Sequence, residues 1–384
     1  MRVGLDGYPL SEPRTGVGHY TLELARALAL ISPQDEFELV SPAPFDPEAQ
    51  REIDRANLPN LRTVNPRASS IRGHWWSFGL PLYARKAGFD LFHGTNFDVP
   101  FWKRRRSVVT IHDLSALLHP DKHRTRMVRR ARLRLPLVVR VADTIITPTE
   151  SVKREVCQRL SVKAGKVTAI PSAARVGFRP IPFAQTVPIR KRLGVEDDFL
   201  LFVGTLEPRK NLVTLLKAFE QILDETSLGP QLVIAGGEGW LMDELFAFTR
   251  KAAIADRLCL TGYLKDDELC ALYSSCKAFI YPSIYEGFGL PPLEAMACGA
   301  PVIAGRIPAL EEILGSAALL VKPMDVEALA EGIAGLLRDE SRRNRLGSAG
   351  QEQTAKFSWE RTACLTLDVY RKLLKTPAGD SDQD

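Results

Sequence analysis

The stretch from Tyr281 to Gly299, YPSIYEGFGLPPLEAMACG, places two carboxylates among glycines and prolines. Glu286 and Glu294 stand eight positions apart, and Gly287 and Gly289 lie between them. Glycine lets the backbone approach a ligand closely, and the N–H groups of a helix that begins at the prolines favour a phosphate. Because two acids would repel a phosphate, we expect them to accept hydrogen bonds from hydroxyls. A nucleotide sugar is the simplest ligand that carries both groups.

Two cations follow a second strand-like run, in residues 201–211, LFVGTLEPRKN. Arg209 and Lys210 stand where a helix begins, and cations at a helix N-terminus oppose the helix dipole. A bound diphosphate would remove this conflict through charge-assisted hydrogen bonds. A solvated helix start is the alternative reading of the same pair.

Two further positions in the first half of the chain end strand-like runs or follow them. His112 comes directly after residues 108–111, at a strand end where ligand contacts are common. His93 also ends a run and is a weaker candidate on the acceptor side. The glycines of the 15–18 segment, TGVG, lack the third glycine of GxGxxG, so they are a poor dinucleotide signature. A tight turn capped by Thr15 explains Gly16 almost equally well.

The E-x7-E arrangement with an internal GFGLP resembles the donor-site signature of the family 4 (group 1) retaining glycosyltransferases of the GT-B fold. The resemblance implies that Glu286 holds the transferred sugar, Glu294 the ribose hydroxyls and Lys210 the donor diphosphate. It also implies that His112 contacts the donor sugar. Thr205 departs from the pattern, because many members carry an arginine directly after the strand glycine. The GTLEPRKN variant resembles that of mannosyltransferases that build surface polysaccharides, which favours GDP-mannose as donor.

The resemblance assigns catalysis to His112, Lys210 and Glu286. It assigns substrate binding to Gly16, Thr205, Arg209, Lys210, Tyr263, Leu264, Glu286, Gly287, Phe288, Gly289, Leu290 and Glu294. The backbone near Tyr263 and Leu264 is expected to flank the base, which leaves uridine and guanosine both open. The sequence has no DxD-type motif in a plausible loop, so we expect no metal and no cofactor. Protein cations would then balance the diphosphate charge.

Two other function classes remain compatible with these residues. A sugar-nucleotide epimerase of the same architecture would bind a similar donor and need no acceptor, so donor turnover without acceptor would favour it. A non-catalytic sugar-binding or lipid-binding scaffold would keep the fold and lose the chemistry. The presence of Glu286, Lys210 and His112 together argues against the scaffold.

The 384 residues suffice for two domains, and short apolar runs alternate with longer amphipathic segments, which is typical of parallel α/β sheets. The predicted strands are 2–5, 36–40, 61–64, 91–93, 108–112, 144–147, 167–170, 200–203, 232–235, 258–261, 278–281, 302–304 and 319–321. By resemblance we expect two Rossmann-like domains that face each other across a cleft. The predicted bounds are 1–178 for an acceptor domain, 179–187 for a linker, 188–357 for a donor domain and 359–375 for a helix that returns to the first domain.

The net charge of +5 comes from basic residues that are concentrated in two segments of the first half of the chain. Residues 122–140 hold eight basic residues and no acid, and Lys103–Arg106 adds four, which leaves 5 − 12 = −7 for the rest. On a helix, Arg126, Arg130 and Arg134 would share one side. Such a patch fits an anionic membrane surface, and a solvated helix face is the alternative. We expect a cytoplasmic enzyme, at the inner face of the membrane if the patch binds lipid, with a saccharide or lipid-linked saccharide acceptor.

Neither an export signal nor a nucleic-acid partner is expected. Met1 leads straight into a strand-like run, no apolar run approaches the ~18 residues that span a bilayer, and the six cysteines show no CxxC pair. The cysteines are therefore expected to be reduced.

Overall fold

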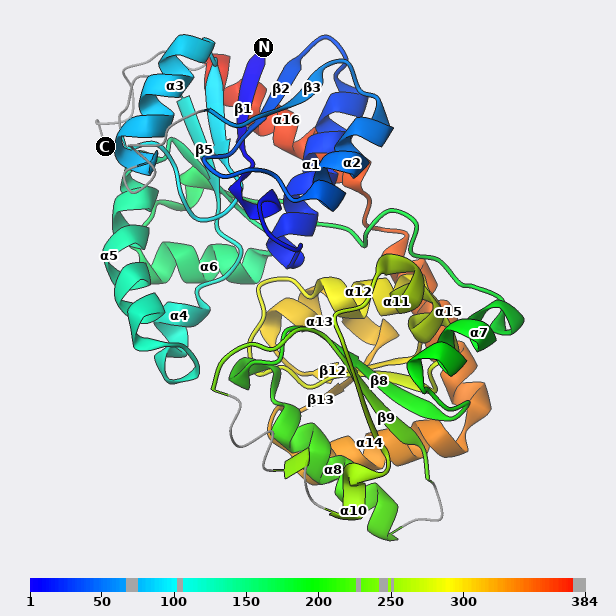
Figure 1. The fold of residues 1–384 in the computed structure, drawn as a ribbon. Helices are drawn as coiled ribbons and strands as arrows, with labels where there is room; N and C mark the ends of the chain where they lie inside the picture. Colours follow the sequence, from blue (N-terminus) through cyan, green and yellow to red (C-terminus); the bar gives the residue numbers. More distant parts are fainter. Residues whose placement is uncertain (67–74, 102–105, 226–228, 242–247, 250–251, 376–384) are drawn as a thin grey trace. The chain divides into compact units, whose positions relative to one another are not determined.

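The computed structural model describes residues 1–66, 75–101, 106–225, 229–241, 248–249 and 252–375. The chain forms two compact units (Figure 1). Unit 1 comprises residues 1–114 and 129–172 together with the C-terminal segment from Ser358. Unit 2 comprises residues 115–128 and 173–357. Of the basic run Lys103–Arg106, residues 103–105 lie outside the described residues.

Unit 1 is built on a seven-stranded sheet in the order β3-β2-β1-β4-β5-β6-β7. All of its strand pairs are parallel. The strands are β1 (Arg2–Asp6), β2 (Glu36–Val40), β3 (Leu61–Val64), β4 (Leu91–Gly94), β5 (Arg106–Thr110), β6 (Thr144–Thr147) and β7 (Val167–Ala169). Because helices cover a parallel sheet on both faces, its central strands are largely buried, as in β1 and β4.

The helices that unit 1 holds in full include α1 (Gly16–Ile31), α2 (Pro47–Ala56), α3 (Leu80–Ala87), α6 (Glu150–Arg159) and α16 (Trp359–Lys375). α5 (Thr125–Val141) begins in residues of unit 2 and ends in unit 1. The predicted return of the last helix is confirmed, since α16 packs against α1 and β5 (Figure 1).

His93 fixes α16 to the sheet. Its Nδ1 lies 2.6 Å from the Tyr370 hydroxyl, and its Nε2 lies 2.8 Å from Oγ1 of Thr110. The side chain is fully buried, and burial lowers the pKa of His93 to about 3. The expectation that His93 lines an acceptor surface is therefore wrong, because the imidazole is a neutral core group that joins two elements.

Unit 2 is also built on a parallel sheet, with six strands in the order β10-β9-β8-β11-β12-β13. Its strands are β8 (Phe199–Val203), β9 (Gln231–Ala235), β10 (Leu258–Gly262), β11 (Ala278–Tyr281), β12 (Val302–Gly305) and β13 (Leu319–Val321). Its helices are α4 (Ser115–Leu118), α7 (Phe183–Leu193), α8 (Leu212–Glu225), α10 (Ala252–Ala255), α11 (Asp266–Ser275), α12 (Leu290–Ala297), α13 (Pro308–Leu314), α14 (Val326–Arg338) and α15 (Glu340–Thr354). The prediction of two parallel α/β sheets is confirmed.

The segment predicted as a linker is partly helical. α7 begins at Phe183, and its Pro188 lies inside the helix. Arg190 stabilises the helix, because its guanidinium lies over the Phe183 ring at 4.6 Å and pairs with Asp197 at 2.6 Å. The boundary between unit 1 and unit 2 falls between Ser172 and Ala173 instead of within the predicted linker. The predicted assignment of acceptor and donor binding to separate domains stays a prediction.

Candidate active site

The strand order of unit 2 brings two loops together at the carboxyl edge of its sheet. β8 and β11 are neighbours, but the chain continues from β8 to β9 on one side and from β11 to β12 on the other. Ligands bind at such reversal points in doubly wound sheets. The loop after β8 carries Arg209 and Lys210, and the loop after β11 carries Glu286. The fold thus unites the two motifs that the sequence placed 76 residues apart.

Backbone geometry fixes the loop that follows β8. Gly204 has a φ of 155°, and a Cβ on Gly236 would stand 2.0 Å from the Gly204 carbonyl oxygen. A 3-10 turn, η6 (Pro208–Lys210), ends at Asn211, which adopts the left-handed conformation with a φ of 59°. The Asn211 amide donates to the carbonyl oxygen of Pro282 over 3.0 Å. This bond holds the loop against the one that follows β11.

Glu286 is the centre of a buried charge cluster. Lys210 Nζ lies 2.5 Å from its Oε1, and Arg209 Nη1 lies 2.9 Å from its Oε2. Lys210 also donates to the Tyr281 hydroxyl over 2.6 Å, and Arg209 pairs with Glu207 at 2.5 Å. The two acids and two bases sum to no net charge. Because Glu207, Lys210 and Glu286 are buried and Arg209 is partly buried, removal of one member leaves its partners without full compensation.

The electrostatics of this cluster keep Glu286 ionised. Burial alone would raise the pKa of Glu286, but the charges of Arg209 and Lys210 outweigh burial and lower the pKa to about 2. Burial and the nearby charge of Arg209 lower the pKa of Lys210, and the charge of Glu286 opposes them. Glu286 is therefore a carboxylate at neutral pH, which accepts hydrogen bonds from hydroxyl groups.

α12 begins beside this cluster, as the glycines and prolines of the sequence predicted. Gly289 is its N-cap with a φ of 105°, and prolines occupy its first turn. A Cβ on Gly289 would stand 2.5 Å from Cδ2 of Leu310, so both conformation and space require glycine. Phe288 is buried, with its ring centroid 6.2 Å from that of Phe357. The residues Gly287 to Leu290 thus form the entry to a helix whose N-terminal end favours anions.

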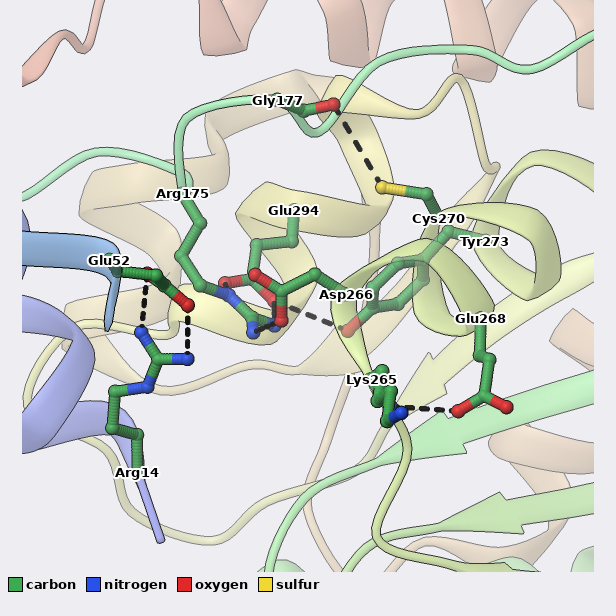
Figure 2. A network of polar contacts seen from close by, with 10 residues as sticks. All are labelled: Arg14, Glu52, Arg175, Gly177, Lys265, Asp266, Glu268, Cys270, Tyr273 and Glu294. Carbon is green, nitrogen blue, oxygen red and sulfur yellow. Dashed lines mark hydrogen bonds and ion pairs between the residues drawn. The ribbon is translucent and has the colours of Figure 1, made fainter. Parts of the chain in front are cut away.

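Glu294, on the same helix, forms a second charged group with a residue that the sequence analysis did not single out. Arg175 forms a bidentate ion pair with the carboxylate: Nε lies 2.6 Å from Oε1 and Nη2 lies 2.9 Å from Oε2 (Figure 2). Nη1 of Arg175 reaches Oδ1 of Asp266 at 2.6 Å. The Tyr273 hydroxyl lies 3.5 Å from Oε2 of Glu294. Burial alone would lower the pKa of Arg175, but the charge and hydrogen bonds of Glu294, together with the charge of Asp266, outweigh it and raise the pKa.

Thr205 and the two residues expected near the nucleotide base, Tyr263 and Leu264, lie at the same carboxyl edge of the sheet. Thr205 follows Gly204 directly after β8, and Tyr263 and Leu264 follow β10. Gly262 turns the chain there with a φ of 70°. Leu264 is buried, whereas Tyr263 is half exposed, at 53%. Tyr263 is therefore the more accessible of the two.

His112 and Gly16 belong to unit 1, at the carboxyl edge of its own sheet. Nε2 of His112 lies 2.8 Å from the Thr95 carbonyl oxygen, and it must carry the proton because a carbonyl only accepts. The rings of Tyr20 and Phe97 meet the imidazole edge-on, at 4.8 and 5.7 Å. Burial lowers the pKa of His112, which favours the neutral ring. Gly16 is the first residue of α1, and no side-chain bond from the residue before it caps that helix.

Five residues of these two groups were not singled out from the sequence: Glu207, Tyr281, Arg175, Asp266 and Tyr273. Glu207 and Tyr281 had a signal, because each lies inside a motif that was singled out. Arg175 had none, because its partner on α12 follows 119 residues later. In the described part of the chain, no three His, Cys, Asp or Glu side chains are grouped to hold a metal. Among the helices of these same residues, none has the length and apolarity to cross a bilayer.

Comparison with known proteins places this site in a family. Residues 187–353 match the model of the glycosyl transferases group 1, and residues 14–175 match that of glycosyltransferase family 4. The chain is 30% identical to the O-antigen chain mannosyltransferase B of Escherichia coli, over 97% of this chain and all of that protein. It is 28% identical to the MMP alpha-(1->4)-mannosyltransferase of Mycolicibacterium hassiacum, over 99% of this chain and all of that one.

A solved structure shares the fold. Anabaena HepE in complex with UDP-glucose superposes with a TM-score of 0.76 at 18% sequence identity, over 97% of this chain and 99% of that one. The fold is therefore GT-B. Together, the family models and the full-length relative show that the chain belongs to the group 1, family 4 glycosyltransferases, and so is a glycosyltransferase.

Proposed function

We propose that this glycosyltransferase moves mannose from a nucleotide diphosphate donor, with GDP-mannose preferred, to a saccharide or lipid-linked saccharide hydroxyl with retention of configuration. The observation that carries the proposal is the buried cluster of Glu286, Lys210 and Arg209 at the sheet reversal point, beside the N-terminus of α12. Support for mannose comes from the two relatives named as mannosyltransferases. The O-antigen relative supports a role in surface polysaccharide assembly.

Each member of the cluster has a proposed task. Glu286 accepts hydrogen bonds from hydroxyls of the transferred sugar. Lys210, Arg209 and the N–H groups around Phe288 to Leu290 stabilise the diphosphate as negative charge develops on it. The oxygen of the departing phosphate takes the proton of the acceptor hydroxyl, so no separate protein base is required. His112 is proposed to contact the donor sugar, and Glu294 to hold the ribose.

The test is a transfer assay with GDP-mannose, UDP-glucose and a set of mannose-terminated acceptors. We expect a mannosylated product only when donor and acceptor are both present, and proton NMR should show an α-linkage from the α-linked donor. Donor turnover without acceptor would favour the epimerase alternative. A β-linked product would exclude the retaining mechanism.

Transfer should not depend on a divalent metal, because in this proposal Arg209, Lys210 and the helix N-terminus stabilise the diphosphate. We expect the rate in excess EDTA to stay within about twofold of the untreated rate, less than 0.5 kcal/mol of barrier. Complete loss on chelation, with recovery on addition of Mg²⁺ or Mn²⁺, would show that a metal carries part of this charge.

We also propose that α5 binds the anionic cytoplasmic face of the membrane, where a lipid-linked acceptor would be held. Part of the predicted patch serves another purpose, since Arg134 and Arg130 pair with Asp98 at 2.5 and 3.4 Å. The helix instead exposes Leu133 and Leu137, which are 71% and 54% accessible and one turn apart. Basic residues beside exposed leucines are typical of helices that lie in a membrane interface.

Liposome co-sedimentation tests this surface with a charge-reversal variant. Arg126, Arg129 and Arg132 are exposed, and their replacement by Glu spares the pair with Asp98. Each basic residue near an anionic surface is worth about 1 kcal/mol, so the variant should lose most of its binding. Binding should also fade by ~0.5 M salt.

A matched control makes the same charge change at exposed bases of unit 2, Lys191, Lys217 and Arg345, and should pellet like wild type. Equal pelleting of the α5 variant and wild type, or no pelleting of either, would rule out this membrane site.

A further inference from the structure

We propose that Arg175 is a positioning residue for the nucleotide ribose: it locks the Glu294 carboxylate so that its two remaining acceptor sites face the two ribose hydroxyls. This inference rests on the proposed function, in which Glu294 holds the ribose. It adds a residue outside the E-x7-E and RK motifs and predicts that Arg175 sets the selectivity for ribose over deoxyribose.

The geometry of the pair leaves acceptor sites on a carboxylate that is itself buried, with Glu294 2% exposed. A carboxylate offers about four lone-pair sites on two oxygens. The Arg175 fork occupies one site on each oxygen, at 2.6 and 2.9 Å. One site on each oxygen then remains, which matches a vicinal diol that donates two hydrogen bonds. The Tyr273 hydroxyl, at 3.5 Å, is too far to compete strongly.

Arg175 has two further contacts, of which Figure 2 shows the one with Asp266. Its third nitrogen pairs with Asp266 at 2.6 Å, and its guanidinium lies over the Phe178 ring with 4.3 Å to the centroid. The residue is 7% exposed, so the fork has little freedom to turn away from Glu294. A lysine at this position would keep the charge, but a single ammonium group could not hold both oxygens in one plane.

The alternative is that Arg175 serves stability alone, because removal of one partner of a buried ion pair is costly. Two measurements on the variants separate these roles: thermal stability, and the selectivity for ribonucleotide over deoxyribonucleotide. A purely structural arginine would change the affinity for ribonucleotide and deoxyribonucleotide by the same factor. A positioning residue would change their ratio.

Calorimetry with purified full-length protein measures the ratio of ribonucleotide affinity to deoxyribonucleotide affinity. The probes are GDP, 2′-deoxy-GDP and 3′-deoxy-GDP, or the uridine series if UDP binds more tightly. In wild type each missing hydroxyl should weaken binding by about tenfold or more, the scale of a hydrogen bond to a charged group. In Arg175→Lys and Arg175→Met the ratio should fall to roughly threefold or less.

Arg190→Met is the matched control. Arg190 is even more deeply buried, pairs with Asp197 and lies over a phenylalanine ring, but it belongs to α7 rather than to the Glu294 group. This variant should lose stability and keep the wild-type ratio. Thermal unfolding confirms that each variant is folded, and Arg175→Lys decides the matter if Arg175→Met does not fold.

Three results would overturn the inference. In the first, the Arg175 variants bind weakly but keep the wild-type ratio, which leaves Arg175 a structural role only. In the second, wild type binds GDP or UDP and does not discriminate against the deoxy forms, so Glu294 does not hold the ribose. In the third, wild type binds neither nucleotide, and then the proposed function fails before the role of Arg175 arises.

Discussion

Replacement of Glu286 by alanine should lower turnover at saturating donor by about a hundredfold or more, with the fold retained. The physical reason is that hydrogen bonds from Glu286 to the sugar would tighten as the glycosidic bond breaks. The variant also frees Lys210 and Arg209 from the carboxylate that they share, so both would hold the diphosphate at least as firmly. We therefore expect kcat to fall and donor affinity to change little.

A control must separate this effect from the loss of a buried ion pair. Glu38 is buried like Glu286 and also meets two cations, Arg2 at 3.3 Å and Arg62 at 2.5 Å, but it lies on β2 of unit 1. Glu38→Ala should lower the melting temperature and leave kcat within a few-fold of wild type below that temperature. If Glu286→Ala retains near-normal turnover with the correct donor, the catalytic assignment of Glu286 is wrong.

The second large effect concerns Lys210. Lys210→Ala should weaken binding of the preferred nucleoside diphosphate by roughly 1.5–3 kcal/mol, the scale of a hydrogen bond to a charged group. The ammonium group is buried, so water screens it little. Its present partners are Glu286 and the Tyr281 hydroxyl, and a diphosphate would have to share the ammonium group with them.

Calorimetry with GDP and UDP measures this change. Lys277→Ala is the control, because Lys277 lies in the same unit and pairs with Asp198 at 2.9 Å on a more exposed surface. Its affinity should match wild type. Unchanged affinity in Lys210→Ala would mean that Lys210 neutralises Glu286 and does not reach the diphosphate.

Most of the fold could be predicted from the sequence because its strands are buried on both faces. Each of the strands predicted for the two sheets is present, with ends within two residues of the prediction, as for 278–281 and β11 (Ala278–Tyr281). Continuous apolar runs such as FLLFV leave little doubt about burial. The placement of Arg209 and Lys210 beside Glu286 could also be anticipated, since both motifs end strands that meet at a sheet reversal point.

The features that were missed depend on contacts that sequence patterns do not carry. α7 was hidden because its buried positions are Thr186 and Arg190, which do not form an apolar stripe, and because Pro188 interrupts it. His93 ends a strand as His112 does, and only the structure shows that α16 covers it through Tyr370. The bond between Arg175 and Glu294 joins two positions without a shared motif.

The central claim is that unit 2 binds a nucleotide sugar at the Glu286 cluster. A thermal-shift titration tests it most directly, with wild type and Lys210→Ala against GDP-mannose, UDP-glucose, GDP and UDP. A donor at about a hundred times its Kd stabilises the folded state by roughly 2.7 kcal/mol. For a unit of this size the melting temperature should then rise by about 5–10 °C. We expect the largest shift with GDP-mannose in wild type and a much smaller one in the variant. No shift with any nucleotide sugar, or equal shifts in both proteins, would contradict it.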